Sequence, residues 1–521
     1  MGLLKSTVTV SSMTMLSRVM GLLRDMVMAR MFGSGVATDA FLVAFRIPNF
    51  LRRLFAEGAF SQAFVPVLSE YRQQREVDEV RSLIRHTAGT LGLVLLLVSI
   101  LAMLFAPAVT SVFATGFLLK YPDKFELTYQ LLRITFPYIL FISLTALAAG
   151  VLNSYGRFAV PAFTPVWLNI CLIIAALWWS PYFAEPITAL AWGVFIAGAA
   201  QLLFQLYFVS RLGLLRWPGI NWRHSGVKRI LKLMLPGIIG SSAMQINLLL
   251  DVMIASFLVT GSVTWLYYAD RMIELPLGVF GIALATVILP ILSSKHSQGD
   301  PRAFSQTMDW ALRLVLVIAL PASVALGILA TPIISTLFQY GDFAAHDVQM
   351  AAWSLLAYSF GLLGFILVKI LAPGYFARQD TRTPVKISMI SMLVNMIANV
   401  VFVLLLLKSG FEAPHAGLAL ATTLSSFVNA ALLLRGLRQQ QIYQPQPGWA
   451  RLFLQVVGAA LIMGLVLHFA ASSEHWWLAG VAKDRILRLS WIIPAGGLVY
   501  MLALYLSGLR FRHLQRPRSG A

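Results

Sequence analysis

Charged side chains lie inside two apolar stretches of the chain, residues 8–32 and 36–69. The first stretch contains Arg18, Arg24 and Asp25. The second contains the run Pro48-Asn49-Phe50-Leu51-Arg52-Arg53-Leu54-Phe55-Ala56-Glu57-Gly58-Ala59-Phe60-Ser61-Gln62-Ala63-Phe64-Val65-Pro66. An arginine at the centre of a bilayer helix costs about 2.5–3.5 kcal/mol on insertion scales. We therefore expect these arginines to face a water-filled cavity, which would suit an anionic cargo.

Basic groups outnumber acidic groups among the charges within apolar stretches. The basic residues are Arg18, Arg24, Arg46, Arg52, Arg53, Arg271 and Lys369, and the acidic residues are Asp25, Asp39, Glu57, Asp270 and Glu274. A guanidinium group stays ionised when it is desolvated and donates two parallel hydrogen bonds, so it matches phosphate oxygens. A diphosphate is the natural complement of this excess. The alternative is a structural role, in which Asp25, Asp39 and Glu274 lock neighbouring spans through ion pairs.

Helical spacing spreads these charges over broad faces. At about 100° per residue, Arg18 and Asp25 share one face of a helix, whereas Arg24 lies about 120° from Arg18. In the second stretch the residues at heptad spacing are Asp39, Arg46 and Arg53. Pro48 and the later Gly58 predict that this second helix is bent or broken.

The composition indicates a polytopic membrane protein of the all-α class. Of the 521 residues, 59% are hydrophobic and 12% are charged, whereas soluble domains carry about 25% charged residues. The net charge of +19 does not indicate nucleic-acid binding, because the aromatic residues are not interleaved with basic patches. The single cysteine, Cys171, lies in an apolar run and is expected to pack as a small apolar residue. The sequence has no nucleotide-binding loop, catalytic triad or metal-ligand cluster, so we expect neither an enzyme nor a cofactor.

We predict fourteen membrane spans, since a spanning helix needs about 20 mostly apolar residues. They are 8–32, 36–69, 87–113, 127–152, 159–180, 187–210, 230–259, 264–293, 308–338, 349–374, 384–407, 415–436, 449–471 and 487–508. Basic loops alternate with loops that hold few or no basic residues, which places both termini in the cytoplasm by the positive-inside rule. The first two spans and the eighth are polar enough that hydropathy alone is expected to miss them.

Two sequence motifs recur about 220 residues apart. Ala-Phe-Val-Pro-Val-Leu-Ser at 63–69 resembles Val-Ile-Leu-Pro-Ile-Leu-Ser at 287–293. Arg157 with the later Thr164-Pro165-Val166 resembles Arg378 with the later Thr383-Pro384-Val385. Each motif falls at the same place in a block of six spans. We therefore predict a parallel repeat about an axis along the membrane normal, with the cargo site between the halves.

The repeat divides the chain into parts. The predicted parts are an N-lobe at 1–212, a cytoplasmic interfacial linker at 213–229, a C-lobe at 230–440, spans 13 and 14 at 441–510 and a basic cytoplasmic tail at 511–521. Span 8 is the repeat partner of span 2, so we expect it to face the same cavity. Its Arg271 should then approach Arg18, Arg24 and Arg52.

The run at 48–66 resembles the signature of the MurJ (MviN) lipid II flippase family of the MOP exporter superfamily, at its proteobacterial end. Further agreement is found at Ser11-Ser12-Met13-Thr14, Ser17-Arg18-Val19, Tyr267-Tyr268-Ala269-Asp270-Arg271 and Pro445-Gln446-Pro447-Gly448-Trp449. The resemblance covers essentially the whole chain, and the signature positions show no departure from the family pattern.

This resemblance implies two pseudo-symmetric six-helix bundles in a V, with two C-terminal helices that form a groove for a lipid tail. It implies a flippase that exports lipid II (undecaprenyl-diphosphate-MurNAc-pentapeptide-GlcNAc) across the bacterial cytoplasmic (inner) membrane for peptidoglycan synthesis. The family's essential cavity arginines fall on Arg18, Arg24, Arg52 and Arg271, which are the expected diphosphate- and headgroup-binding residues. The expected secondary cavity residues are Asp25, Asp39, Asn49, Arg53, Glu274 and Lys369. The expected partners are lipid II and membrane lipids. Whether a coupling ion or the membrane potential supplies the energy is left open.

Two other functions are weighed against lipid flipping. A cation or drug antiporter of the MATE type would need acidic groups to attract its cargo, and the arginine excess argues against it. A non-transporting membrane scaffold for cell-wall enzymes would not need arginines near the middle of the membrane.

Overall fold

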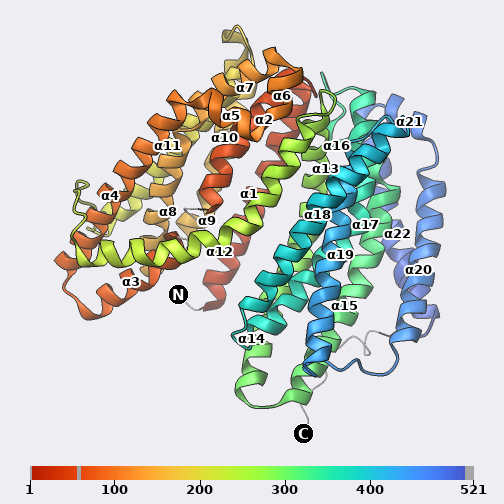
Figure 1. Cartoon of the computed structure of the whole chain (residues 1–521). Coiled ribbons are helices and arrows are strands. Elements are labelled where there is room, and N and C mark those ends of the chain that lie inside the picture. Colours follow the sequence, from red (N-terminus) through yellow and green to blue (C-terminus); the bar gives the residue numbers. More distant parts are fainter. Residues whose placement is uncertain (1–2, 55–59, 511–521) are drawn as a thin grey trace. The chain divides into compact units, whose positions relative to one another are not determined.

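The computed structural model describes residues 3–54 and 60–510, and these residues form helices joined by turns and loops, with no strand among them (Figure 1). Glu57, Gly58 and the predicted tail at 511–521 lie outside the described residues. The elements are α1 (Leu3–Phe32), α2 (Val36–Arg52), α3 (Ser61–Gln74), α4 (Val77–Leu104), α5 (Ala106–Phe113), α6 (Thr115–Lys120), α7 (Pro122–Thr135), α8 (Tyr138–Ser154), α9 (Ala159–Phe163), α10 (Pro165–Ile174), η2 (Ala175–Trp179), η3 (Ser180–Tyr182), α11 (Thr188–Arg211), α12 (Ser225–Ala255), α13 (Ser262–Pro276), η4 (Leu277–Ile282), α14 (Ala283–Ser297), α15 (Pro301–Ile328), α16 (Ala330–Phe338), α17 (Ala345–Phe376), α18 (Arg382–Lys408), α19 (Ala416–Gln439), α20 (Trp449–Ala470), α21 (Glu474–Ala479) and α22 (Ala482–Leu506). The predicted all-α class is confirmed.

Eleven helical stretches among the described residues are long and apolar enough to cross a membrane. The predicted spans 8–32, 36–69 and 230–259 coincide with α1, with α2 and α3, and with α12, but none of these helices is among the eleven. The expectation that hydropathy would miss the eighth span was wrong. The stretch Ser262–Ser297 is among the eleven, because its apolar second half outweighs the charges near its start. The count of fourteen spans stays a prediction.

The internal repeat is visible in the positions at which helices begin and break. Helix α4 runs from Val77 to Leu104 and is followed by a break at Phe105, and α15 runs from Pro301 to Ile328 with a break at Leu329. The start of α15 follows the start of α4 by the same number of residues as the end of α15 follows the end of α4. Pro290 follows Pro66 by that number as well. The two halves thus share one helical register, as the sequence motifs predicted.

The second span of each half is interrupted at the matching place. Helix α2 ends at Arg52 and continues into π-helical turns at 53–54, while α13 ends at Pro276 and continues into the π-helical segment η4. A π-helical turn inserts an extra residue into the helix and frees a backbone carbonyl, and such turns are frequent at functional sites. The predicted bend or break in the second span is confirmed, and its partner in the second half shares it.

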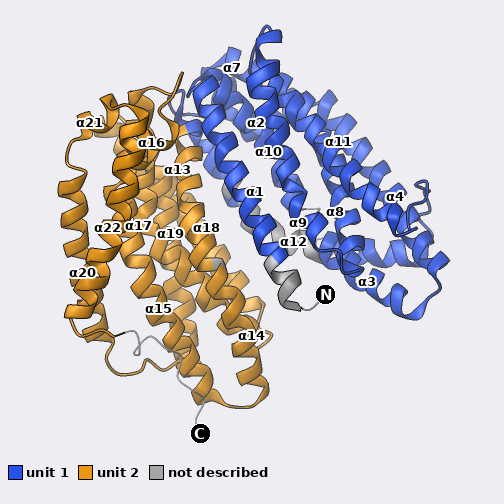
Figure 2. Ribbon diagram, turned by 180° about the vertical axis from the view of Figure 1, so that it is seen from behind, with its two compact units in different colours: residues 1–264 blue, residues 265–521 orange. Residues whose placement is uncertain are grey.

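The chain forms two compact units, residues 1–264 and 265–521 (Figure 2). The boundary falls within α13, after Thr264. It lies later than the predicted linker at 213–229, because α12 packs against α3 in the first unit. The predicted lobes and their functional boundaries stay a prediction.

In the first unit, the loops predicted to be cytoplasmic lie together at one end. Helices α3, α4, α8, α11 and α12 bury a common apolar core there. Arg81 Nε donates to the carbonyl of Gly213 at 2.8 Å, and Arg229 forms an ion pair with Glu70 at 2.8 Å. Arg72 donates to the carbonyl of Ser154. The segments 70–86, 153–158 and 211–229, which were predicted as loops but include the ends of neighbouring helices, are therefore tied to one another.

In the second unit, the two C-terminal helices pack against α15. Helices α20 and α22 share an apolar core with α15 and α21. The buried carboxylate of Asp309 on α15 accepts hydrogen bonds from Tyr443, Gln446 and Trp449, at 2.7–3.1 Å. Asp309 also forms an ion pair with Arg313 at 2.6 Å. This carboxylate therefore fixes the segment that leads into α20.

Candidate functional site

Arg24 on α1 is buried and is held by protein groups. The residue is 6% exposed. Its Nε and Nη2 atoms donate to Asp25 Oδ1 at 2.9 and 2.6 Å, and Nη1 donates to Asn169 Oδ1 at 3.1 Å. Asn169, on α10, donates in turn to the carbonyl of Ser17 at 3.2 Å. The expectation that Arg24 faces water without a partner in the chain is therefore wrong for this structure, and Asp25 is a structural counter-charge.

Asn169 was missed by reasoning from the sequence. It lies within an apolar run, and the only available signal was a single amide between Leu168 and Ile170. A buried amide in an apolar helix needs hydrogen-bond partners. Its bond to Arg24 shows that α1 and α10 present polar groups to each other, which agrees with the packing of α1 along α10.

Arg52 is half-buried at the end of α2, next to the π-helical turns. Its Nε donates to Asn49 Oδ1, one helical turn earlier, at 2.8 Å. This bond orients the guanidinium group. Arg53 and Arg18 are also half-buried, on the π-helical turn and on α1. The structure thus pairs the predicted residues Arg52 and Asn49 directly.

Arg271 and Glu274 form an ion pair on α13 in the second unit. Arg271 Nη1 lies 2.7 Å from Glu274 Oε2, and Nη2 donates to the hydroxyl of Tyr267 at 3.1 Å. The side chains of Arg271 and Glu274 are 34% and 44% exposed. The guanidinium group also lies over the Tyr267 ring, 5.0 Å from its centroid. Because the pair is accessible, an incoming anion can compete with Glu274 for the arginine.

Lys369 on α17 lies beside the π-helical segment of the same unit. A methyl group added at Gly281 would lie 3.8 Å from Lys369 Cγ. The lysine is half-buried. The second unit therefore places one predicted secondary residue next to its helix interruption.

Asp39 lies away from these arginines, in a buried cluster at the other end of α2. The residue is 1% exposed, and its Oδ2 atom forms an ion pair with Lys124 at 2.6 Å. Oδ2 also accepts from the backbone N–H of Gly261 at 2.8 Å. Oδ1 accepts from the N–H and the hydroxyl of Thr264 at 2.9 and 2.6 Å. All of these residues belong to the first unit. The carboxylate was expected to line a cavity, but here it faces protein donors, which supports the alternative of a structural ion pair.

Lys124 could not be found from the sequence. It is 2% exposed and lies 4.3 Å from the centroid of the Phe117 ring. It lies between the predicted spans 87–113 and 127–152, and 85 residues separate it from Asp39. No spacing rule connects two residues so far apart.

Within each unit the predicted arginines have partners on their own helix. Arg24 and Arg271 each have a carboxylate, and Arg52 contacts the neutral amide of Asn49. Guanidinium groups match phosphate oxygens in geometry and charge. Among the described residues, no group of three or more histidine, cysteine, aspartate or glutamate side chains could hold a metal ion.

Comparisons with known proteins agree on one family. A family model described as "Lipid II flippase MurJ" matches residues 28–487. The probable lipid II flippase MurJ of Vibrio cholerae serotype O1 is 46% identical over 98% of this chain and 98% of its own length. The lipid II flippase MurJ of Burkholderia cenocepacia is 43% identical over 99% of both chains.

Solved structures show the same relationship. A lipid II flippase MurJ in an inward closed conformation is similar with a TM-score of 0.78 and 29% identity, over 95% of this chain and 98% of that chain. An inward-facing MATE family transporter of the MOP superfamily is similar with a TM-score of 0.67 and 14% identity, over 84% of this chain and 98% of that chain. The second likeness shows a shared fold alone. The chain belongs to the lipid II flippase MurJ family.

Proposed function

We propose that this chain moves lipid II from the inner to the outer leaflet of the bacterial inner membrane by alternating access. In this proposal Arg18, Arg24, Arg52 and Arg271 bind the diphosphate. The family assignment and the arginines within apolar helices support it. The observation that carries the chemistry is the accessible Arg271–Glu274 pair, whose arginine can exchange its carboxylate for a phosphate oxygen.

The local counter-charges explain how the empty protein tolerates its arginines. Several guanidinium groups without counter-ions would repel one another and would be costly within the membrane. Asp25 and Glu274 reduce this cost for Arg24 and Arg271. Asn49 orients Arg52 but adds no charge.

The alternatives are less well supported. A MATE-type antiporter needs acidic groups that are available to a cation, but Asp25 and Asp39 are buried in ion pairs. A scaffold without transport gives no reason for half-buried arginines beside a helix interruption. We further propose that both termini lie in the cytoplasm, which the grouping of the basic loops at one end of the first unit supports.

Arg52 gives the sharpest test, because it lies half-buried beside the helix interruption. The purified chain is reconstituted in vesicles with labelled lipid II, and transport between leaflets is followed with and without an imposed membrane potential. We expect Arg52→Ala to lose transport and Arg52→Lys to recover little of it, because an ammonium group lacks the paired donors of a guanidinium group. Dependence of the rate on the potential would identify the energy source.

Arg75→Ala is the matched control, because Arg75 is an arginine on the surface whose side chain is 55% exposed. We expect it to transport at the rate of the unmodified chain. Normal transport by a folded Arg52→Ala variant would refute the role of this arginine. Absence of transport by the unmodified chain under all conditions would refute the proposed function itself.

A further inference from the structure

A pocket in the second unit carries two glutamates and has no role in the transport reaction proposed above. Its volume is about 380 Å³, and small-ligand sites measure about 300–1,000 Å³. It lies between the end of α15, the starts of α16, α17 and α21, and the segment that joins α18 to α19. All of these elements belong to the second unit.

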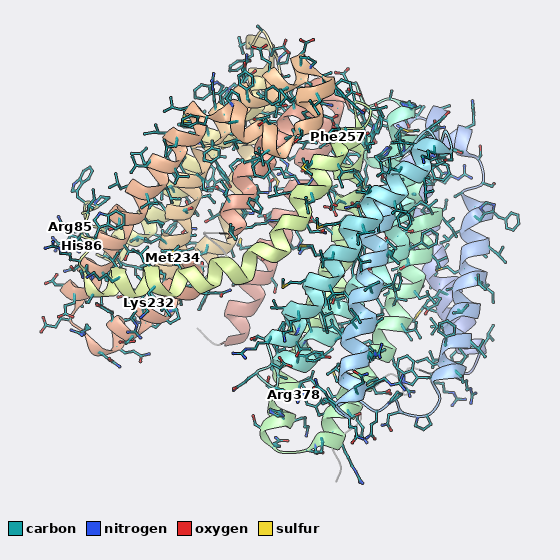
Figure 3. The ribbon with its side chains drawn as sticks, viewed as in Figure 1. Arg85, His86, Lys232, Met234, Phe257 and Arg378 are labelled. Atoms are coloured by element: carbon teal, nitrogen blue, oxygen red, sulfur yellow. The ribbon has the colours of Figure 1, made fainter. Side chains whose placement is uncertain are left out.

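The pocket lies at the end of this unit that is predicted to face outward. Residues of the loops 408–414 and 472–486 line it, and both loops are poor in basic residues. Figures 1 and 2 place α16 and α21 together at this end. In Figure 3, Arg378 of a predicted cytoplasmic loop lies at the opposite end of the same unit. We therefore expect the pocket to open at the outer surface of the membrane.

The wall of the pocket is negatively charged. Among the described residues that line it, only Glu412 and Glu474 carry a charge. Both are exposed, and neither side chain has an ion pair or hydrogen bond within the part of the chain that the structure describes. Two carboxylates at one site favour a cation between them. This wall stands out in a chain whose net charge is +19.

Neutral groups complete the wall. The ring of Trp353 is 43% exposed and packs edge-on against Phe411, with 5.1 Å between the ring centroids. An aromatic face beside carboxylates is suited to an ammonium group. Gln349 and Thr331 are half-buried, their side chains have no hydrogen-bond partner among the described residues, and their polar atoms are not enclosed. Both can donate a hydrogen bond to a ligand.

The pocket continues into an apolar stripe along α17. Gln349, Trp353, Leu356 and Phe360 follow one another at helical spacing on one face, which we call the α17 stripe. Phe360 is 59% exposed. Lys369 lies nine residues later, about 180° around the helix. Since α17 is long and apolar enough to span the membrane, the stripe is expected to face lipid rather than the candidate site. It is polar at the pocket and apolar deeper in the membrane.

We propose that this pocket binds the headgroup of an outer-leaflet lipid with a primary ammonium group, such as phosphatidylethanolamine. Glu412 and Glu474 accept hydrogen bonds from the ammonium group, which has three donors. Gln349 and Thr331 donate to the phosphate oxygens, and the acyl chain follows the α17 stripe. A soluble amine would leave this stripe uncovered. A divalent cation is a poorer occupant, because Ca²⁺ takes about 6–8 oxygen ligands and much of the wall is apolar.

The test uses the full chain in vesicles that contain a lipid with a photoactivatable group near the top of one acyl chain. The same acyl chains carry an ethanolamine, choline or glycerol headgroup. We expect cross-linked peptides from the first four turns of α17. The yield should be highest with ethanolamine, lower with choline, which lacks N–H donors, and lowest with glycerol, which has no positive charge.

Two double variants change the charge of the wall. The variant Glu412→Gln, Glu474→Gln should lower the yield with the ethanolamine lipid about fivefold, as expected for two exposed ion pairs, and should not lower the yield with the glycerol lipid. The variant Glu412→Lys, Glu474→Lys should favour the glycerol lipid over the ethanolamine lipid. Glu185→Gln is the matched control, because Glu185 is an exposed glutamate in a first-unit loop predicted to face the same side. It should leave all yields unchanged.

Folding is followed separately by thermal melting. Both glutamates are exposed and have no partner within the described residues, so both double variants should melt at the temperature of the unmodified chain. Equal labelling by the three lipids, or an ethanolamine-lipid yield that the first double variant leaves unchanged, would overturn the proposal. Competition by millimolar soluble ethanolamine would identify a soluble amine as the occupant, and displacement by Mg²⁺ alone would identify a divalent cation. Either result would also overturn it.

Discussion

The buried ion pair between Asp39 and Lys124 allows a quantitative prediction about stability. The aspartate accepts four hydrogen bonds, from Lys124, from the N–H of Gly261 and from the N–H and hydroxyl of Thr264. These contacts tie the start of α2 and the start of α7 to the segment that leads from α12 into α13. The same end carries a bond from Lys120 to the carbonyl of Phe257 at 2.8 Å, near the top of Figure 3.

Asp39→Ala should lower the free energy of unfolding by about 3–5 kcal/mol, which is typical when one partner of a buried ion pair is removed. The ammonium group of Lys124 is 2% exposed, so it cannot recover its hydration without local opening. Lys124→Met should cost less than Asp39→Ala, because the carboxylate keeps three of its four hydrogen bonds. The double variant Asp39→Ala, Lys124→Met should regain part of the loss, since no charge remains buried.

The measurement is unfolding in mixed micelles of a mild detergent and sodium dodecyl sulfate, with all four proteins of the double-mutant cycle. The pair Arg75–Glu79 is the control, because its side chains are 55% and 50% exposed. Exposed pairs contribute about 0.2–1 kcal/mol. An effect of Asp39→Ala no larger than that of Glu79→Ala would refute the reasoning. Additive effects of the two single replacements would show that the two side chains do not interact.

Three further predictions concern the site, the topology and pH. The Arg24→Ala variant should lose both transport and thermal stability, whereas the Arg52→Ala variant should lose transport alone. Transport and melting temperature are measured in parallel, and an equal loss of stability in the two variants would contradict this. In a Cys171→Ser background, a cysteine introduced by Tyr182→Cys should react with an impermeant thiol reagent from outside, and one introduced by Trp217→Cys only from inside. Tyr182 and Trp217 are 86% and 90% exposed. The opposite labelling pattern would overturn the span count. Burial, reinforced by nearby His86, lowers the pKa of His224 in the folded chain. Below about pH 6.5 the unfolded chain therefore binds more protons than the folded chain. Thermal stability should fall as the pH drops below about 6.5, and it should fall less in the His224→Gln variant.

The repeat was the most informative feature of the sequence. The prolines at positions 66 and 290 fixed the register of the two halves, and the helix bounds of α4 and α15 follow it. Patterns of this kind are local, because a proline or a run of apolar residues acts on the helix that contains it. The segment 260–263 joins two predicted spans, and it is mostly buried, with the N–H of Gly261 donating to Asp39.

Contacts between distant segments could not be predicted from one sequence. The bond from Arg24 to Asn169 spans 145 residues, and the ion pair of Asp39 with Lys124 spans 85. Each residue alone looked like an isolated polar group, and its partner is defined only once the helices are packed. The sequence therefore predicts candidate arginines and acids, but not the contacts that join residues far apart in the chain.

The pairing of Arg24 with Asp25 changes how the charge excess should be understood. Adjacent residues on a helix point in different directions, and the helical geometry alone placed Arg24 apart from the face shared by Arg18 and Asp25. The long arginine side chain overcomes this difference and reaches Asp25 Oδ1 at 2.6 Å. A buried carboxylate that neutralises an arginine also lowers its attraction for phosphate. Arg24 is thus held by a buried carboxylate, whereas Arg271 is paired with a carboxylate whose side chain is 44% exposed.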